Sequence, residues 1–270
     1  MGKEVFNRRE VKYMLSEKEF EKLSARLKDF IEEDAFNREN GLYTICNIYY
    51  DTFDDYLIKH SLSKPAYKEK LRLRGYGIPS PLDCVYLEIK KKYKGKVNKR
   101  RTPIRLKDAC FYFETGCWPE MEYSVNVQVL REIEYMVNTY QLKPKVYLAY
   151  DRMAYFASEH KGLRITFDTN IRCRRHNLRL DDGDYGGLLL GEGYRLMEIK
   201  AEHAMPIWLG RMLAEEKIYP VSFSKYGTEY QVYLHDQYER NGMNPCLIQY
   251  LNLFSEAAPA QPSSILEVLY

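Results

Sequence analysis

The sequence predicts an α+β fold built on an antiparallel β-barrel, closed or nearly closed, with helices packed on its outside. Two patterns lead to this prediction. At least seven segments are rich in β-branched and aromatic residues or alternate apolar with charged residues, as half-buried strands do. They follow one another in hairpin-like succession, with segments of helical apolar spacing interspersed. Such a succession of antiparallel strands is typical of sheets that curl into barrels.

The N-terminal part of the chain is predicted to form a strand followed by a helix. Residues up to about 12 alternate between charged and apolar side chains, and Ser16 with Glu19 forms the capping-box pattern of a helix start. The apolar side chains of this helix recur at helical spacing. They are Phe20, Leu23, Leu27, Phe30 and Ile31.

Strands and a short helix are expected next, and the chain then alternates between helices and strands. Strands are predicted at 43–52, 68–77, 84–93, 97–106, 145–157, 163–174 and 194–202. Helices are predicted near 53–60, 106–115, 124–140, 205–218 and 224–237. From Asn241 the composition shifts to Pro, Ala, Gln and Ser, which is typical of a poorly packed segment. We therefore predict one folded domain over residues 1–240 and a tail over residues 241–270.

The composition argues against several classes of protein. The 270 residues carry a net charge of only +3, so the chain is not a broadly basic nucleic-acid coat, and a cationic site must be local. The six cysteines show neither a redox pair nor zinc-ligand spacing. No run approaches the roughly 18 apolar residues of a membrane span, and the N-terminus lacks the apolar core of a signal peptide. We expect a cytoplasmic protein that binds no nucleic acid and does not insert into a membrane.

Charged residues share strand faces in this sequence. In KEKLRLRGYG (residues 68–77) cations occupy every second position, so a strand places them on one side. These cations are Lys68, Lys70, Arg72 and Arg74. Other predicted strands show the same parity at Glu10, Lys12, Glu88, Lys90, Arg164, Asp168, Glu198 and Lys200. An ordinary solvated face would also contain Ser, Gln and Asn, so we interpret these faces as the lining of a lumen.

A lumen of this composition suits a metal–polyphosphate complex. Unpaired buried cations are costly, so such a lumen must hold water and bind anions. Glu10, Glu88 and Glu198 would offer hard oxygen ligands to Mg²⁺ or Mn²⁺, which bridge to phosphate oxygens. No glycine-rich phosphate loop occurs, and GDYGGLLLGEG (residues 183–193) is interpreted as a turn. Phosphoryl transfer fits these residues because it depends on positioning and charge stabilisation.

Several motifs in order resemble the VTC domain, the polyphosphate polymerase branch of the triphosphate tunnel metalloenzyme (CYTH-like) superfamily. The resemblance extends from about residue 4 to about residue 238. Its motifs are RREVKYML, NIYYDT, KLRLRGYG, LEIKKKYKGKVNKRR, YDRMAYF, LRITFDTNI, LMEIK and SFSKYGTEY. The first strand departs from the Glu-x-Glu-x-Lys pattern of the superfamily because Arg8 stands at its first position. This difference favours the VTC branch over the triphosphatase branches.

The resemblance implies an antiparallel tunnel in which the γ-phosphoryl group of ATP is added to a growing polyphosphate chain, with Mn²⁺ or Mg²⁺ as cofactor. It gives catalytic and phosphate-binding roles to Arg72, Arg74, Lys90, Arg152, Arg164 and Lys225. Further phosphate-binding residues are Lys12, Lys70, Lys99, Tyr150 and Lys200. Glu198 matches the metal-binding glutamate, and Glu10 and Glu88 are further metal candidates.

Two other functions fit the same residues. One is a tripolyphosphatase or nucleoside triphosphatase that transfers the phosphoryl group to water, and the other is a non-catalytic polyphosphate-binding domain. The chain shows neither the N-terminal sensing domain nor the C-terminal membrane helices of eukaryotic family members, so we expect a stand-alone domain of the bacterial type. The sequence does not identify a membrane or transport partner. We expect Arg172, Arg174 and Arg175 to form an exposed cluster or one at the tunnel mouth.

Overall fold

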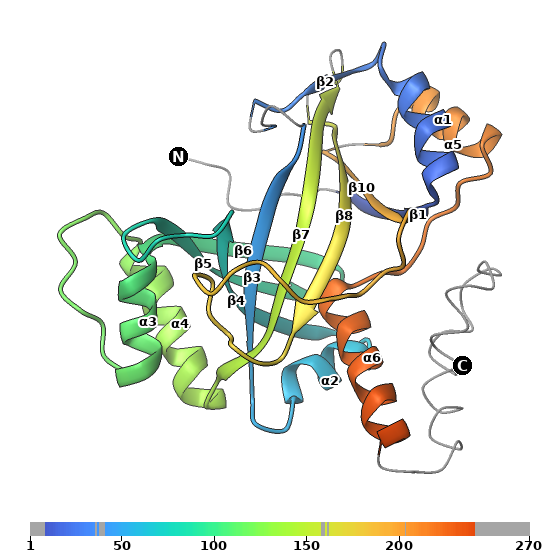
Figure 1. Ribbon diagram of the computed structural model, residues 1–270. Coiled ribbons are helices and arrows are strands. Elements are labelled where there is room, and N and C mark those ends of the chain that lie inside the picture. The colour runs from blue at the N-terminus through green and yellow to red at the C-terminus, as the bar shows by residue number, and fades with distance from the viewer. Residues whose placement is uncertain are drawn as a thin grey trace.

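One antiparallel sheet organises the protein (Figure 1). The computed structural model describes residues 9–35, 37, 41–157, 160, 162–202 and 204–240. The strands are β1 (Arg9–Leu15), β2 (Ile31–Glu33), β3 (Tyr43–Asp51), β4 (Tyr67–Tyr76), β5 (Cys84–Tyr93), β6 (Lys96–Arg105), β7 (Lys143–Ala157), β8 (Arg164–Arg174), β9 (Gly187–Leu188) and β10 (Arg195–Ala201). Their hydrogen-bonded order is β1-β10-β8-β7-β3-β4-β5-β6, with β2 added to β7 and β9 added to β8.

The sheet is strongly curled, although its two edge strands do not pair with each other. In Figure 1, β4, β5 and β6 cross behind β3, β7 and β8 at a steep angle. Among the described residues there is no β1–β6 ladder. The predicted fold class is confirmed, and the barrel is open along this seam.

Two pairs of helices cover the convex face, as the sequence predicts. α1 (Glu17–Leu27) and α5 (Ile207–Glu215) pack over β1, β8 and β10, and α3 (Leu106–Thr115) and α4 (Val127–Tyr140) pack over β3 to β6. Leu23, Phe167, Met197 and Leu209 lie at the centre of the first core. Leu71, Leu87, Tyr112 and Ile133 lie at the centre of the second. The two cores fix the curvature of the sheet from outside.

At one end of the sheet a helix also covers the concave face, in addition to the helices on the outside. α6 (Lys225–Arg240) packs against the concave face, and Ile58 and Leu62 of α2 (Tyr56–Leu62) join the same core. Tyr226 of α6 stacks on Tyr49 of β3 with ring centroids 4.7 Å apart. The physical reason is that the inward positions of β3 and β7 are apolar here, as Leu148 illustrates. These positions need hydrophobic cover, so α6 closes this end of the concave face.

Several element boundaries also differ from expectation. The capping box of Ser16 and Glu19 is confirmed, but α1 ends at Leu27. Phe30 and Ile31 therefore lie outside the helix. Ile31 begins β2 and pairs with Ala157 of β7. The glycine-bearing turn contains β9. A Cβ on Gly186, the residue before β9, would lie 2.6 Å from the carbonyl oxygen of Cys173, closer than any side chain allows.

Two further observations bear on how the chain is organised. No described helix has the length and apolar character needed to cross a membrane. Residues 241–270 fall outside the described residues, so the predicted domain boundary after residue 240 stays a prediction.

Replacing Ser16 with Ala is expected to destabilise the fold by about 1 kcal/mol, because the hydroxyl accepts from the amide of Glu19 at the start of α1. Chemical denaturation measures this change in the free energy of unfolding. Ser24→Ala, at a half-buried position within the same helix, is the matched control and should be neutral or slightly stabilising. Equal effects of the two substitutions would show that the cap contributes nothing.

Candidate functional site

The register of the sheet brings the predicted site residues onto its concave face. Cross-strand partners share a face, and the ladder through β1, β10 and β8 aligns Lys12 with Glu198 and Thr166. On the neighbouring strands, β4 and β5 place Arg72 opposite Glu88. The other predicted residues on this face are Glu10, Lys70, Arg74, Lys90, Lys99, Tyr150, Arg152, Arg164 and Lys200. Strand parity therefore located this face correctly.

Asp168 joins two of the predicted cations in the middle of β8. Its carboxylate accepts two hydrogen bonds from the guanidinium of Arg152, at 2.6 and 2.8 Å. Lys225, the first residue of α6, donates to the same carboxylate. Burial opposes the charge of Asp168, but Arg152 and Lys225 outweigh burial and lower its pKa to about 2. Asp168 is therefore an ionised internal counter-ion that also ties α6 to the sheet.

Glu88 holds the second group of cations on β4 to β6. Its Oε2 lies 2.7 Å from Nε of Arg72 and its Oε1 lies 2.7 Å from Nζ of Lys99. Arg74 approaches the same carboxylate at 3.8 Å. Burial works against the charge of Glu88, but these three cations outweigh burial and hold its pKa well below its usual value. The structure therefore places Glu88, a predicted metal ligand, as a counter-ion between phosphate-binding candidates.

Glu198 forms the third acidic centre, on β10. It pairs with Lys200 two residues along the strand, and Lys12 lies on the neighbouring strand. Lys12 also donates to the carbonyl oxygen of Phe223 at 2.9 Å and approaches Glu10 at 3.8 Å. Burial opposes the charge of Glu198, but Lys200, Lys12 and Arg152 outweigh it and lower its pKa. Glu198 is ionised at neutral pH and has fewer close cations than Glu88.

Two predicted cations have no acidic partner among the residues that the structure describes. In the part of the chain that the structure describes, neither Lys70 nor Lys90 forms an ion pair with a carboxylate. Lys70 lies over the ring of Tyr226 with its Nζ 5.5 Å from the centroid. Burial lowers the pKa of Lys70 to about 8, and the nearby Lys68 and Lys90 add to this shift. A polyanion in this part of the site would restore the charge balance of both lysines.

Polar residues that the sequence analysis did not single out complete the site. Asn47 and Tyr49 of β3 accept hydrogen bonds from Arg74 and Arg72, at 3.0 and 3.2 Å. They occupy alternate positions of a predicted strand, so the same parity argument could have identified them. Arg164 pairs with Asp34 at 2.9 Å. Asp34 lies after β2 and outside any alternating pattern, so the sequence offers no signal for it.

Of the two alternatives expected for the arginines after the middle of β8, an exposed cluster is wrong, whereas a cluster at the tunnel mouth stays a prediction. Arg174 is 4% exposed, and its guanidinium lies 3.5 Å from the ring centroid of Tyr147. It donates to the carbonyl oxygens of Asn177, Arg179 and Tyr185. Arg172 pairs with Asp151 and Asp184, and Arg175 pairs with Glu229 of α6. These arginines hold loops and α6 in place because each is satisfied by nearby oxygens.

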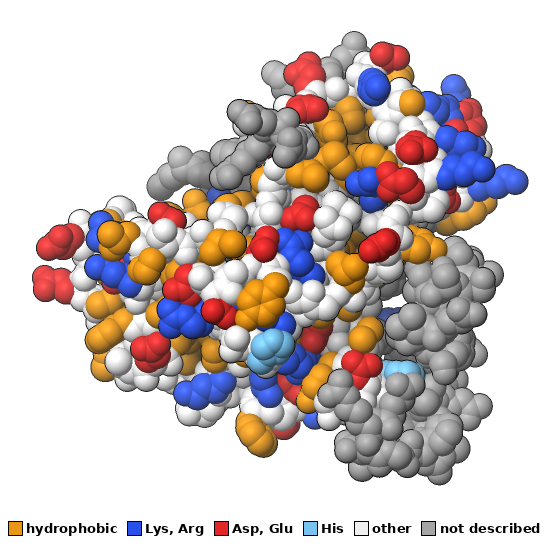
Figure 2. All heavy atoms as spheres, viewed as in Figure 1, with side chains coloured by type: hydrophobic (Ala, Val, Ile, Leu, Met, Phe, Trp, Pro, Cys, Tyr) orange, Lys and Arg blue, Asp and Glu red, His pale blue; other side chains and the backbone are white. Residues whose placement is uncertain are grey.

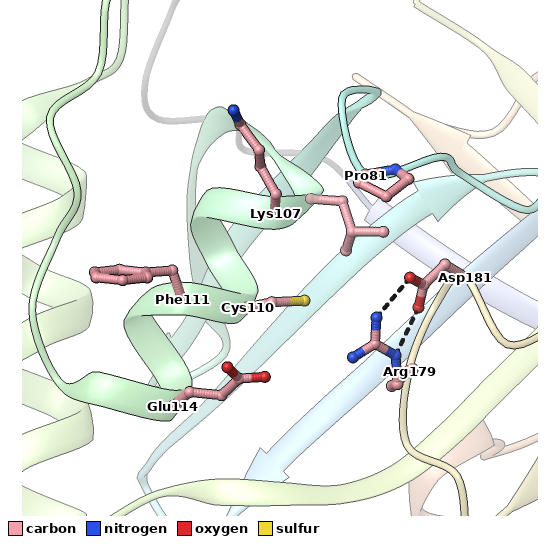
Figure 3. Close-up of a pocket in the computed structure, with 8 residues that line it drawn as sticks. Pro81, Lys107, Cys110, Phe111, Glu114, Arg179 and Asp181 are labelled. Carbon is pink, nitrogen blue, oxygen red and sulfur yellow. Dashed lines mark hydrogen bonds and ion pairs between the residues drawn. The ribbon is translucent and has the colours of Figure 1, made fainter.

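Charges of both signs alternate on the part of the described surface that Figure 2 shows, and a cavity lies beside α3. In the view of Figure 2, Lys and Arg side chains are interspersed with Asp and Glu side chains. Figure 3 shows a cavity of about 240 Å³ beside α3, on the convex side of the sheet. Four of its lining residues are charged, and two of them, Arg179 and Asp181, bind each other through two hydrogen bonds, at 3.0 and 2.7 Å. The concave face, which gathers the predicted cations and buried carboxylates, is therefore the candidate functional site.

The donor set fits a divalent metal that is shared with a phosphate ligand. No three His, Cys, Asp or Glu side chains of the described residues are close enough together to enclose a metal. Mg²⁺, however, is commonly bound through one or two carboxylates together with substrate phosphates. Glu198, with Glu10 near the same Lys12, offers that kind of site. Glu88 is less suited, since its oxygens are engaged by cations.

Comparisons with known proteins agree with this geometry. A family model described as the VTC domain matches residues 7–234. Two relatives are each named vacuolar transporter chaperone complex subunit 4. The protein from Trypanosoma brucei brucei is 27% identical over 209 residues, and the protein from Trypanosoma cruzi is 23% identical over 212 residues. Each match covers 64% of this chain and 26% of the relative, so the chain spans about a quarter of their length.

A solved structure shares the fold. It is described as a "putative adenylate cyclase" from Bacillus halodurans and aligns with a TM-score of 0.50 at 18% identity. The alignment covers 83% of this chain and 96% of that one. At this identity the likeness supports the fold alone.

The low pKa of Asp168 makes part of the folding stability sensitive to acid. Its folded pKa of about 2 lies below the ordinary 3.8, so its contribution is present above about pH 4 and is lost as the pH falls through 2. The free energy of unfolding should fall by about 2 kcal/mol more in the wild type than in Asp168→Asn over this range. Denaturant titrations between pH 5 and pH 2 measure the difference. Asp29→Asn, at an exposed position, is the control and should retain the wild-type slope.

Proposed function

Because this chain belongs to the VTC domain family, we propose that it is a polyphosphate polymerase that transfers the γ-phosphoryl group of ATP to a polyphosphate chain on its concave face. The observation that carries this proposal is a single face on which cations outnumber acids and are held in place by buried carboxylates. Phosphate oxygens bind guanidinium groups in the same paired geometry as carboxylates do. The face is therefore preorganised for a chain of phosphates.

The reaction requires little covalent chemistry from the protein. A terminal oxygen of the polyphosphate attacks the γ-phosphorus, the bond from that phosphorus to the β–γ bridging oxygen breaks, and ADP leaves with the electron pair. Arg72 and Arg74 on one side and Arg152 on the other would hold the phosphate oxygens in line. Lys225, at the start of α6, would neutralise charge that develops on the bridging oxygen.

The acidic residues of the concave face have two different roles in this proposal. Asp168 and Glu88 keep their cations oriented, whereas Glu198, with Glu10 beside it, would hold the divalent metal. When bound, Mg²⁺ or Mn²⁺ supplies charge neutralisation to the phosphate oxygens. The lowered pKa of Glu198 supports this assignment because a metal ligand must be deprotonated.

The location and partners of the chain belong to the same proposal. We infer that it acts in the cytoplasm, where ATP is available. The relatives are named as subunits of a transporter chaperone complex. By analogy, this chain would pass its product to a membrane or transport partner.

Purified protein incubated with ATP and Mn²⁺ or Mg²⁺ is expected to form long polyphosphate chains and ADP, resolved on a polyacrylamide gel. Glu198→Gln should reduce chain synthesis by at least about 100-fold, because the metal contributes several kcal/mol to phosphoryl transfer. Glu192→Gln, at an exposed position, should keep full activity. Free phosphate as the sole product would instead indicate a triphosphatase. ATP that is bound but not consumed would indicate a polyphosphate-binding domain.

Arg72→Ala should weaken the binding of inorganic tripolyphosphate by at least about tenfold, because a charge-assisted contact to phosphate is lost. Isothermal titration calorimetry without added metal measures this affinity in the absence of turnover. Arg131→Ala, on the exposed side of α4, removes the same charge from the convex side and should leave the affinity unchanged. An unchanged affinity in Arg72→Ala would exclude Arg72 from the phosphate site.

A further inference from the structure

Three tyrosines form a connected aromatic surface at the end of the concave face opposite α6. Tyr43 of β3 and Tyr76 of β4 have ring centroids 6.3 Å apart. Tyr76 and Tyr86 of β5 meet edge to face at 6.0 Å. The guanidinium of Arg101 on β6 lies over the ring of Tyr86 at 4.8 Å. We call Tyr43, Tyr76 and Tyr86 the aromatic platform.

The aromatic platform is continuous with the cationic part of the site. Tyr76 follows Arg74 by two residues on β4, so the two side chains are neighbours on the concave face. Tyr43 pairs with Arg152 across β3 and β7, and its hydroxyl accepts from Arg164 at 3.4 Å. A ligand whose phosphates contact these arginines would carry its adjoining group over the platform.

The exposure of Tyr76 distinguishes it from Tyr49 and Tyr150, two tyrosines of the concave face that lie nearer α6. Its side chain is 44% exposed, whereas Tyr49 and Tyr150 are 8% and 3% exposed. Tyr49 is also covered by Tyr226 of α6, with which it stacks. The end closed by α6 therefore offers no open ring, and the platform offers one beside the arginines.

The backbone holds Tyr76 rigidly although its ring is exposed. Tyr76 pairs with Ile45 of β3, and the amide of the following Gly77 donates to the carbonyl oxygen of Thr44 at 2.9 Å. On the convex side, a Cβ at Gly75 would lie 3.3 Å from the ring of Pro79, so the strand end is tightly packed. A rigid, exposed ring loses little entropy when another ring stacks on it.

We propose that the aromatic platform binds the nucleobase of the nucleoside triphosphate, with Tyr76 supplying the stacking face and Arg101 a cation beside it. This inference rests on the proposed function and adds to it a subsite for the nucleoside. Aromatic side chains stack on every base, so the platform selects for a nucleoside but not for its identity. ATP and GTP are therefore expected to bind alike at this subsite.

Comparing nucleoside triphosphates with inorganic tripolyphosphate tests the subsite. In calorimetric titrations with EDTA, Tyr76→Leu should weaken ATP and GTP binding by between about 5-fold and about 100-fold. The same variant should bind tripolyphosphate within about twofold of the wild type, because its phosphate contacts are unchanged. Tyr76→Phe keeps the ring and should bind ATP as the wild type does. Tyr135→Leu, which removes a 72% exposed tyrosine from α4, is the matched control and should change neither ligand.

The outcomes separate this inference from the proposed function. Tyr86→Leu provides a second variant, and thermal unfolding checks that each variant folds. If ATP binding survives both Tyr76→Leu and Tyr86→Leu, or if tripolyphosphate binding falls equally, the nucleobase subsite is wrong while the phosphate site stands. If the wild type binds neither ATP nor tripolyphosphate, the proposed function fails and the subsite fails with it.

Discussion

The concave face depends on buried carboxylates that neutralise its cations. Lys and Arg side chains repel one another and lose hydration when a curled sheet brings them together, at a cost of several kcal/mol for each uncompensated charge. Asp168 has no exposed surface and accepts from both Arg152 and Lys225, while Glu88 is 1% exposed and contacts Arg72 and Lys99. These acids allow the cations to share one face of a folded domain.

The same ion pairs determine how the face would receive a polyanion. Guanidinium groups held on one side by a carboxylate keep other N–H donors for a ligand, and their orientation is already fixed. Arg152 illustrates this arrangement, since the carboxylate of Asp168 accepts hydrogen bonds from its Nε and one terminal nitrogen, at 2.6 and 2.8 Å. Ordering these side chains before binding reduces the entropy lost on binding. The free-energy cost of bringing these cations together is therefore met when the protein folds, before a polyanion binds.

Strand parity, with the succession of predicted strands, predicted the fold class, most of the strands and which charged residues share the concave face. Alternation fixes which residues share a face, so Arg72, Glu88 and Glu198 could be grouped without a structure. Register cannot be deduced this way, because parity does not say which strand pairs with which. The pairing of Glu88 with Arg72 and Lys99 follows from that register.

The other misses have related physical causes. The run from Tyr43 to Asp51 is almost wholly buried, so alternation disappears and the sequence does not show that α6 covers its concave side. Asp34 reaches Arg164 from a segment after β2, through a contact far apart in sequence. Contacts between residues far apart in the chain do not produce a periodic pattern in the sequence. The apolar spacing predicts a longer α1 than the structure shows. Ile31 fits that helical spacing but belongs to β2, the short strand that pairs with β7.

The types of side chain on the concave face change in order along β4. Along this face its side chains run from the exposed ring of Tyr76 through Arg74 and Arg72 to Lys70 and Lys68. A ring, paired guanidiniums and ammonium groups follow one another in the order in which a nucleoside, its triphosphate and a longer phosphate chain would meet them. Lys70 and Lys68 contact α6 and α2 through the ring of Tyr226 and the carbonyl oxygen of Ser61. A growing chain on the proposed path would therefore pass beside α6, and the position of that helix, anchored by Lys225 on Asp168, would be linked to the phosphate site itself.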